Sequence, residues 1–157
     1  MMKNWMLKFM NFWPPFLGSG IKVKQVDADF RNIDVELNMH FWTRNYVGSH
    51  YGGSIYSMTD PFYMLMLIQN LGKDYIVWDK SAEVRFLKPG YGKLTANFNL
   101  SAERIAEIKK AADENYKHEP TFTVQIKNQQ GEVVAEVDKV IYVRRKDRTK
   151  NDPPPAP

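Results

Sequence analysis

The side chains of this chain that could do chemistry are concentrated in the segment 45–60. It carries an amide at Asn45, an imidazole at His50, the pair Gly52–Gly53 and a carboxylate at Asp60. A carboxylate can act as a general base toward water. Backbone N–H groups beside glycine can approach a ligand closely and stabilise a developing oxyanion. The spacing predicts a site where the start of a helix and an acid meet an apolar ligand.

Three further residues of the segment are candidates for this site. Ser54 and Ser57 could position a water molecule, and Met58 could contact an apolar chain. Every candidate also has a purely structural interpretation. Glycine pairs form tight turns, loop asparagines shape turns, and lone histidines and methionines pack in cores.

Asp60 is followed by Pro61. Proline within a helix lacks a donor and clashes with the carbonyl group four residues earlier, here that of Ser57. We therefore expect a kink near Asp60 that leaves the Ser57 carbonyl free for another donor. The alternative is that Asp60 is the N-cap of a helix beginning at Pro61.

The composition excludes several kinds of site. The absence of cysteine excludes disulfides, thiol nucleophiles and cysteine–metal sites, and it fits a cytoplasmic protein. The three histidines have no paired spacing, so we expect no metal. There is no phosphate-binding loop, no dinucleotide fingerprint and no Gly-x-Ser-x-Gly nucleophile motif.

The charge and length favour one domain with a basic tail. Residues 144–150 carry five basic and one acidic side chain, which equals the whole formal net charge of +4. Such a tail solubilises a terminus, so we expect no nucleic-acid partner. We place a single domain over 1–145, with an N-terminal helix over 1–17, and a disordered, proline-rich tail over 146–157. The helix 1–17 is expected to pack on the body rather than to contact a membrane, and the alternative is that it caps an apolar tunnel.

The remaining pattern predicts an α+β fold. A long apolar run over 52–71 indicates a buried central helix, which Gly72 ends. Ser101 should cap a second helix. Alternating apolar and polar residues predict about six strands in a curved antiparallel sheet around the central helix. These strands cover 21–29, 33–39, 75–88, 94–100, 122–126 and 133–143. One helix cannot cover such a sheet fully, which favours dimerisation.

The candidate residues also resemble a known family. Asn45, His50, Gly52–Gly53 and Asp60 resemble the Asn…His-Gly-Gly…Asp pattern of phenylacetyl-CoA-type acyl-CoA thioesterases, members of the hotdog-fold superfamily. Here Tyr51 separates the histidine from the glycine pair.

Longer segments extend the resemblance over roughly residues 5–145. Residues 82–90, followed by Gly92-Lys-Leu, resemble the strand and turn after the central helix of that family. Residues 13–21 and 51–61 resemble more closely a little-characterised thioesterase-like branch of the superfamily.

The resemblance implies a hotdog fold and hydrolysis of an acyl thioester. Asp60 would be the general base or nucleophile, and the amides of Gly52 and Gly53 the oxyanion donors. Asn45 would orient the carbonyl group or the water, and His50 would be a second acid–base group. The substrate would be a thioester of CoA or of acyl carrier protein, with no cofactor beyond the CoA of the substrate. The assembly would be a homodimer or a dimer of dimers.

Two other functions stay open. A hotdog dehydratase or hydratase also uses a histidine and an acid, but its characteristic loops are absent from the sequence. A hotdog protein that binds an acyl thioester without catalysis would tolerate the displaced histidine and the Asp60–Pro61 step.

Overall fold

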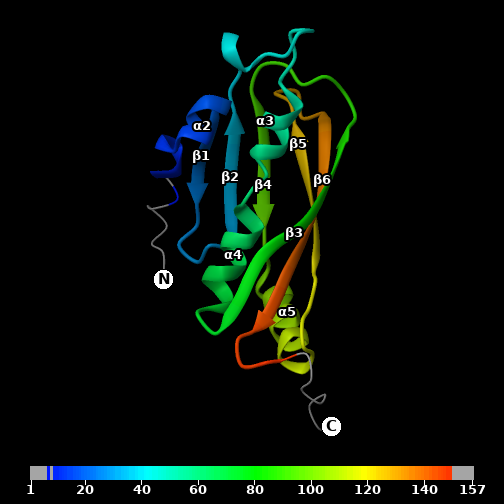
Figure 1. The fold of residues 1–157 in the computed structure, drawn as a ribbon. Helices are drawn as coiled ribbons and strands as arrows, with labels where there is room; N and C mark the ends of the chain where they lie inside the picture. Colours follow the sequence, from blue (N-terminus) through cyan, green and yellow to red (C-terminus); the bar gives the residue numbers. More distant parts are fainter. Residues whose placement is uncertain (1–6, 8, 150–157) are drawn as a thin grey trace.

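A computed structural model describes residues 7 and 9–149 of the chain. Six antiparallel strands form one sheet in the order β1-β2-β4-β5-β6-β3 (Figure 1). The strands are β1 Ile21–Val26, β2 Asn32–Leu37, β3 Tyr75–Phe86, β4 Leu94–Asn99, β5 Thr121–Lys127 and β6 Val133–Arg145. The α-helices are α2 Pro14–Ser19, α3 Gly52–Ser57, α4 Phe62–Leu71 and α5 Ala102–Glu114, and the 3₁₀ turns are η1 Met10–Phe12 and η2 Phe41–Thr43.

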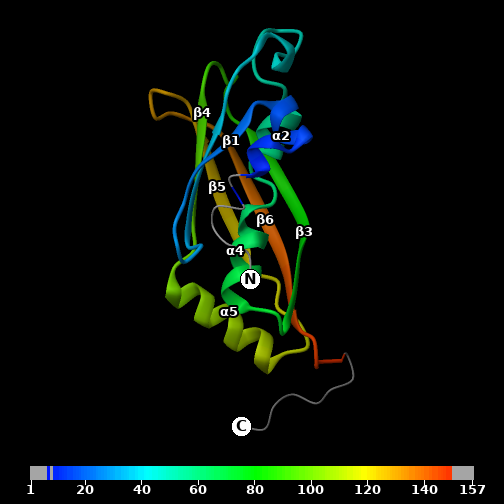
Figure 2. The ribbon, with the colours of Figure 1, turned by 90° about the vertical axis from the view of Figure 1, so that its left-hand side faces the viewer.

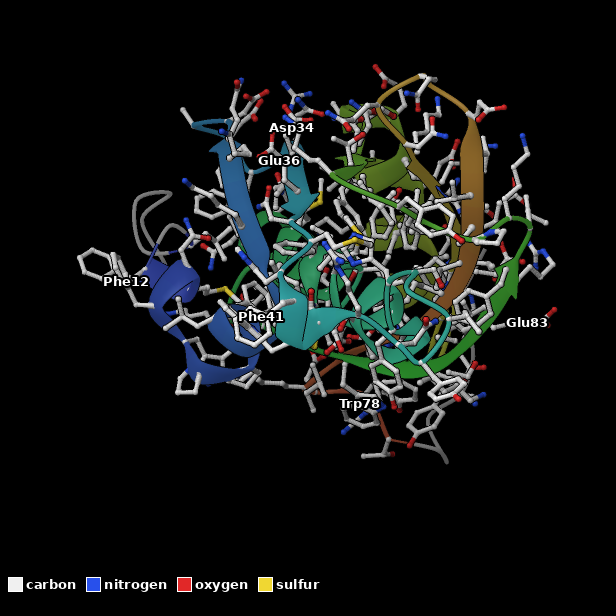
Figure 3. The ribbon with its side chains drawn as sticks, turned by 90° about the horizontal axis from the view of Figure 1, so that it is seen from above. Phe12, Asp34, Glu36, Phe41, Trp78 and Glu83 are labelled. Atoms are coloured by element: carbon white, nitrogen blue, oxygen red, sulfur yellow. The ribbon has the colours of Figure 1, made fainter. Side chains whose placement is uncertain are left out.

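The sheet curves around α3 and α4, as the turned view shows (Figure 2). Successive side chains of a strand point to opposite faces of the sheet, so apolar residues face the helices and polar residues face outward. In β2 the apolar Ile33, Val35 and Leu37 are buried, whereas Asp34 and Glu36 lie on the outer face (Figure 3). The expected hotdog arrangement, a curved antiparallel sheet around a central helical segment, is therefore confirmed.

The core lies between the sheet and α4. Phe62 and Met66 of α4 are fully buried. The Phe62 ring lies 4.9 Å from the ring of Phe98 on β4, and the Tyr63 ring stacks on Phe122 of β5 at 4.4 Å. Burying each such aromatic side chain contributes roughly 1.5–3 kcal/mol, so these contacts fix α4 firmly on the sheet.

The central helical segment is interrupted at Asp60, where a cis peptide bond joins it to Pro61. The expected kink is confirmed, because α3 ends at Ser57 and α4 begins at Phe62. The expectation of a free Ser57 carbonyl is wrong, since the Asp60 N–H donates to it at 3.2 Å. A tightened last turn satisfies the carbonyl groups at the end of α3 in this way. The alternative, that Asp60 is the N-cap of a helix beginning at Pro61, is also wrong. The N-cap of α4 is Pro61, one residue later.

The two halves of the sheet are joined weakly. Between β4 and β5 only the pairs Thr95–Lys127 and Ala96–Ile126 are formed among the described residues. By contrast, β6 pairs with β3 and β5 along most of its length. Beyond these pairs a pocket of about 720 Å³ opens between the strands and reaches the ring of Tyr63.

The two ends of the chain differ in part from expectation. In the described part of the predicted 1–17 helix, Leu7 and Phe9 are helical, and the short elements η1 and α2 follow with an extended Trp13 between them. Residues 1–6 and 8 of that prediction lie outside the described residues. The start of the predicted tail is bound to the body, because the Lys146 N–H donates to the Asp74 carbonyl oxygen at 2.9 Å. Arg148 likewise donates to the Asp113 carbonyl oxygen at 2.6 Å.

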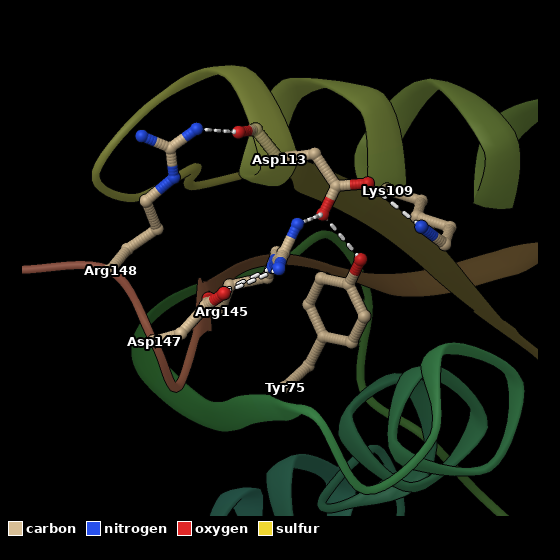
Figure 4. A network of polar contacts seen from close by, with 6 residues as sticks. All are labelled: Tyr75, Lys109, Asp113, Arg145, Asp147 and Arg148. Atoms are coloured by element: carbon tan, nitrogen blue, oxygen red, sulfur yellow. Dashed lines mark hydrogen bonds and ion pairs between the residues drawn. The ribbon is translucent and has the colours of Figure 1, made fainter. Parts of the chain in front are cut away.

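Asp113 at the end of α5 organises this anchorage (Figure 4). Its carboxylate accepts hydrogen bonds from the Tyr75 hydroxyl at 2.5 Å and from Lys109 Nζ at 2.7 Å. Arg145 of β6 lies 3.5 Å from the same carboxylate. The ends of β3, β6 and α5 are thereby held together. Within the described residues, no helix is long and apolar enough to span a membrane.

Candidate functional site

A pocket of about 410 Å³ lies at the start of α3. Asn45, His50 and Gly52 line it on one side, and residues 86–90, at and just after the end of β3, line it on the other. The structure therefore brings together three of the predicted site residues. Phe86 covers the helix start closely, since a Cβ atom on Gly52 would lie 3.0 Å from its ring.

His50 is buried and its ring is oriented by the backbone. Its side-chain Nε2 lies 2.6 Å from the Gly92 carbonyl oxygen, so Nε2 carries the proton and donates. No hydrogen-bond partner among the described residues reaches Nδ1. Burial lowers the pKa of His50, although the hydrogen bond to Gly92 opposes this shift. The ring is therefore neutral at neutral pH and presents Nδ1 as an acceptor.

Asn45 shapes the loop before α3. Its Oδ1 accepts hydrogen bonds from the N–H groups of Val47 and Ser49, both at 3.1 Å. Its Nδ2 donates to Ser49 Oγ at 2.8 Å and to the His50 carbonyl oxygen at 3.2 Å. Both ends of the amide are thus used in holding the turn, which is the structural role that asparagine commonly plays in loops.

The N–H groups of Gly52 and Gly53 donate to no acceptor among residues 7 and 9–149. Free donors at this place are the feature that oxyanion stabilisation needs. The other three candidates lie in α3 or directly after it, and each is buried or hydrogen-bonded within the protein. Ser54 is buried, and Ser57 Oγ donates to the Gly53 carbonyl oxygen at 2.7 Å. Met58 is fully buried in the core.

Asp60 lies just beyond the other end of α3. Its sequence neighbours are mostly apolar, but 46% of its side chain is exposed. Its Oδ1 accepts a hydrogen bond from Lys139 Nζ on β6 at 3.0 Å. Lys139 Nζ also forms an ion pair with Asp79 of β3 at 2.8 Å. The acid thus belongs to a group of three charged side chains from three different parts of the fold.

The sequence prediction missed Lys139 and Asp79. Lys139 is 79 residues from Asp60 in the chain, so no local spacing connects them. One signal was present: on the inner face of β6, a lysine interrupts an apolar alternation between Val137 and Ile141. A charged residue at such a position requires a buried partner.

The candidate residues therefore form two groups at opposite ends of α3. Gly52 begins α3 and Asp60 lies three residues beyond its last residue, Ser57; α3 alone separates the two groups by ~8 Å, from a rise of about 1.5 Å per residue. Asp60 is not among the residues that line the pocket around His50. Among residues 7 and 9–149, no three His, Cys, Asp or Glu side chains are grouped so as to hold a metal ion.

Comparison with known families gives one match over most of the chain. Residues 3–143 match the family described as a domain of unknown function, DUF4442. No curated protein matches the chain.

Solved structures of similar fold include several bacterial proteins. A protein of unknown function from Pseudomonas aeruginosa, described as a probable thioesterase, is 22% identical, with 92% of this chain and 97% of that one covered and a TM-score of 0.79. A thioesterase from Haemophilus influenzae is 14% identical, with 96% of each chain covered and a TM-score of 0.67. The PaaI protein of the Escherichia coli phenylacetic acid degradation operon is 18% identical, with 93% and 95% covered and a TM-score of 0.61.

Proposed function

The chain belongs to the DUF4442 family, and from this membership and its hotdog fold we propose that it hydrolyses acyl thioesters, with acyl-CoA as the substrate class. One observation carries the proposal: a water-accessible carboxylate and unpartnered backbone N–H groups lie at the two ends of α3. The descriptions of two structural neighbours as thioesterases support the same reaction.

The proposed reaction assigns each group a step. Asp60 takes a proton from water as the water oxygen forms a bond to the thioester carbonyl carbon. The N–H groups of Gly52 and Gly53 stabilise the negative charge that develops on the carbonyl oxygen. The carbon–sulfur bond then breaks, and the leaving thiolate recovers the proton from Asp60. The products are a carboxylic acid and a thiol.

The separation of the two groups favours a homodimer with composite sites. Gly52 lies against Phe86, whereas Asp60 and Asp79 share Lys139, so α3 runs antiparallel to β3. The outer edge of β3 pairs with no strand among the described residues. If two β3 edges pair antiparallel about a two-fold axis, the Gly52 end of one copy faces the Asp60 end of the other. Two complete sites would then form at the interface.

Hydrolysis of a panel of acyl-CoA thioesters tests the proposal. Wild-type protein is compared with Asp60→Asn, which keeps the shape of the side chain, and with Asp74→Asn, which removes an exposed carboxylate at the start of β3. Loss of a general base predicts a roughly 10²–10⁴-fold fall in kcat for Asp60→Asn alone. Equal activity of wild type and Asp60→Asn would remove Asp60 from the mechanism. Tight acyl-CoA binding without hydrolysis by wild type would instead favour a binding protein.

A further inference from the structure

A lysine stands on the inner face of the sheet, where the fold calls for an apolar residue. Lys139 has apolar neighbours on the same face of β6, Val137 and Ile141, and its side chain is only 1% exposed. Burying an ammonium group costs several kcal/mol unless opposite charges and hydrogen bonds compensate. An aliphatic side chain would fill the same place without that cost, so packing alone does not account for Lys139.

The groups around the ammonium come from three elements. Asp79 on β3 lies 2.8 Å from Nζ, and Asp60, in the connection between α3 and α4, lies 3.0 Å from it. The ring of Tyr56 on α3 has its centroid 5.5 Å from Nζ. Among the described residues, these are the charged and titratable groups that contact Lys139. The cluster thus contains one cation and two carboxylates.

The two carboxylates are not equivalent. The Asp79 side chain is 22% exposed and is the closer partner, whereas that of Asp60 is 46% exposed. Asp79 is therefore suited to keep Lys139 charged within the fold. Asp60 has only Oδ1 hydrogen-bonded to Lys139, and no donor among the described residues reaches its Oδ2. One carboxylate oxygen is held in place while the other is left for a water molecule.

The pKa shifts of Lys139 and Asp79 reflect the same contacts. Burial disfavours the ammonium form, but the ion pair with Asp79 and the hydrogen bond and charge of Asp60 outweigh it, so the pKa of Lys139 is raised. Burial raises the pKa of Asp79, and the nearby charge of Asp60 adds to this, against the lowering by Lys139. Lys139 is therefore charged at neutral pH and donates its hydrogen bond to Asp60.

We propose that Lys139, held by Asp79, is a positioning residue that fixes the orientation of the Asp60 carboxylate. The inference rests on the proposed function in one respect, namely that Asp60 is the base. It adds two residues to the site that contact Asp60 or one another and need not touch the substrate. Positioning matters because a displacement of about 1 Å at a reacting group can lower a rate by roughly 100-fold.

The kinetic test uses two variants and a matched control. Lys139→Met removes the ammonium while keeping a flexible side chain of similar length. Asp79→Asn removes the anchoring charge and keeps the shape of that side chain. Lys80→Met is the control, because Lys80 is a β3 lysine whose ion pair is with the surface residue Glu119. We expect kcat to fall roughly 100-fold in Lys139→Met and less in Asp79→Asn, with KM within about twofold of wild type.

A second readout does not depend on activity. Crystal structures of wild type and of the two variants would show the Asp60 carboxylate in one orientation in wild type and rotated or in several orientations in the variants. If wild type hydrolyses no thioester, the proposed function fails, and this structural comparison still decides the inference. If Lys139→Met does not fold, Asp79→Asn decides it. The inference is overturned if a folded variant keeps kcat within about twofold of wild type, or if Asp60 keeps its wild-type orientation.

Discussion

Replacing His50 should expose how much of the site's stability depends on one hydrogen bond. His50 is 2% exposed, and its Nε2 donates to the Gly92 carbonyl oxygen at 2.6 Å. Phenylalanine has a ring of similar size but no donor. His50→Phe would therefore keep most of the packing and leave the Gly92 carbonyl without a partner among the described residues.

The cost follows from that lost partner. An unsatisfied buried acceptor costs about 1–3 kcal/mol. His50→Ala should cost more, about 2–4 kcal/mol, because it also opens a cavity. The order wild type, His50→Phe, His50→Ala is thus the expected order of falling stability.

The same variant should flatten the dependence of stability on pH. Burial lowers the pKa of His50 below its ordinary value of 6.5. The unfolded chain therefore binds a proton at a pH where the folded protein does not. With respect to this group, the free energy of unfolding is highest above pH 6.5, and it falls as the pH drops from 6.5 toward the lowered pKa. One such group contributes at most about 1.4 kcal/mol per pH unit.

Urea unfolding between pH 5 and pH 8 measures both effects. His50→Phe should have a smaller pH slope than wild type in this range. His118→Gln is the matched comparison, because burial also lowers the pKa of His118 and its removal should flatten the slope in the same direction. A His50→Phe protein with wild-type stability and an unchanged slope would show that His50 is neither buried nor hydrogen-bonded as described.

Two further substitutions test the local geometry by thermal unfolding. Gly20 has a φ of +79°, and a Cβ atom there would lie 2.3 Å from the Asn38 carbonyl oxygen, so Gly20→Ala should lower the free energy of unfolding by at least about 2 kcal/mol. Gly131 has a φ of +81° with open space around it, so the control Gly131→Ala should lower it by only about 1 kcal/mol. Equal costs would refute the predicted clash. Ser101→Ala removes the side-chain acceptor for the N–H of residue 104 at the start of α5 and should cost about 1 kcal/mol, whereas an unchanged melting temperature would contradict the cap.

The strands were predictable because their signal is local. Alternation of apolar and polar residues placed β2 at 33–39, and the structure has it at Asn32–Leu37. The cap at Ser101 and the helix end at Gly72 follow from side-chain and backbone chemistry within a few residues, and both are confirmed. The break near Asp60 belongs to the same class, because Pro61 alone requires it.

The site was predictable only in part, because its contacts join distant segments. Asn45, His50 and Gly52 do line one pocket, and their role in it stays a prediction. The separation of these residues from Asp60, and the contact of Asp60 with Lys139, depend on how α3 lies against β3 and β6. The docking of residues 146–148 on Asp74 and Asp113 is similarly a tertiary contact that the basic composition of the tail does not reveal.

The short junction between β4 and β5 is a seam at which the sheet has few backbone pairs. Within the part of the chain that the structure describes, two residue pairs link the ribbon of β1, β2 and β4 to the ribbon of β5, β6 and β3. The backbone amide of Asn97, beyond the two pairs on β4, should therefore exchange with deuterium faster than those in the middle of β6, where both neighbours are paired. Opening of this seam would separate the two ribbons while each keeps its own ladder of hydrogen bonds.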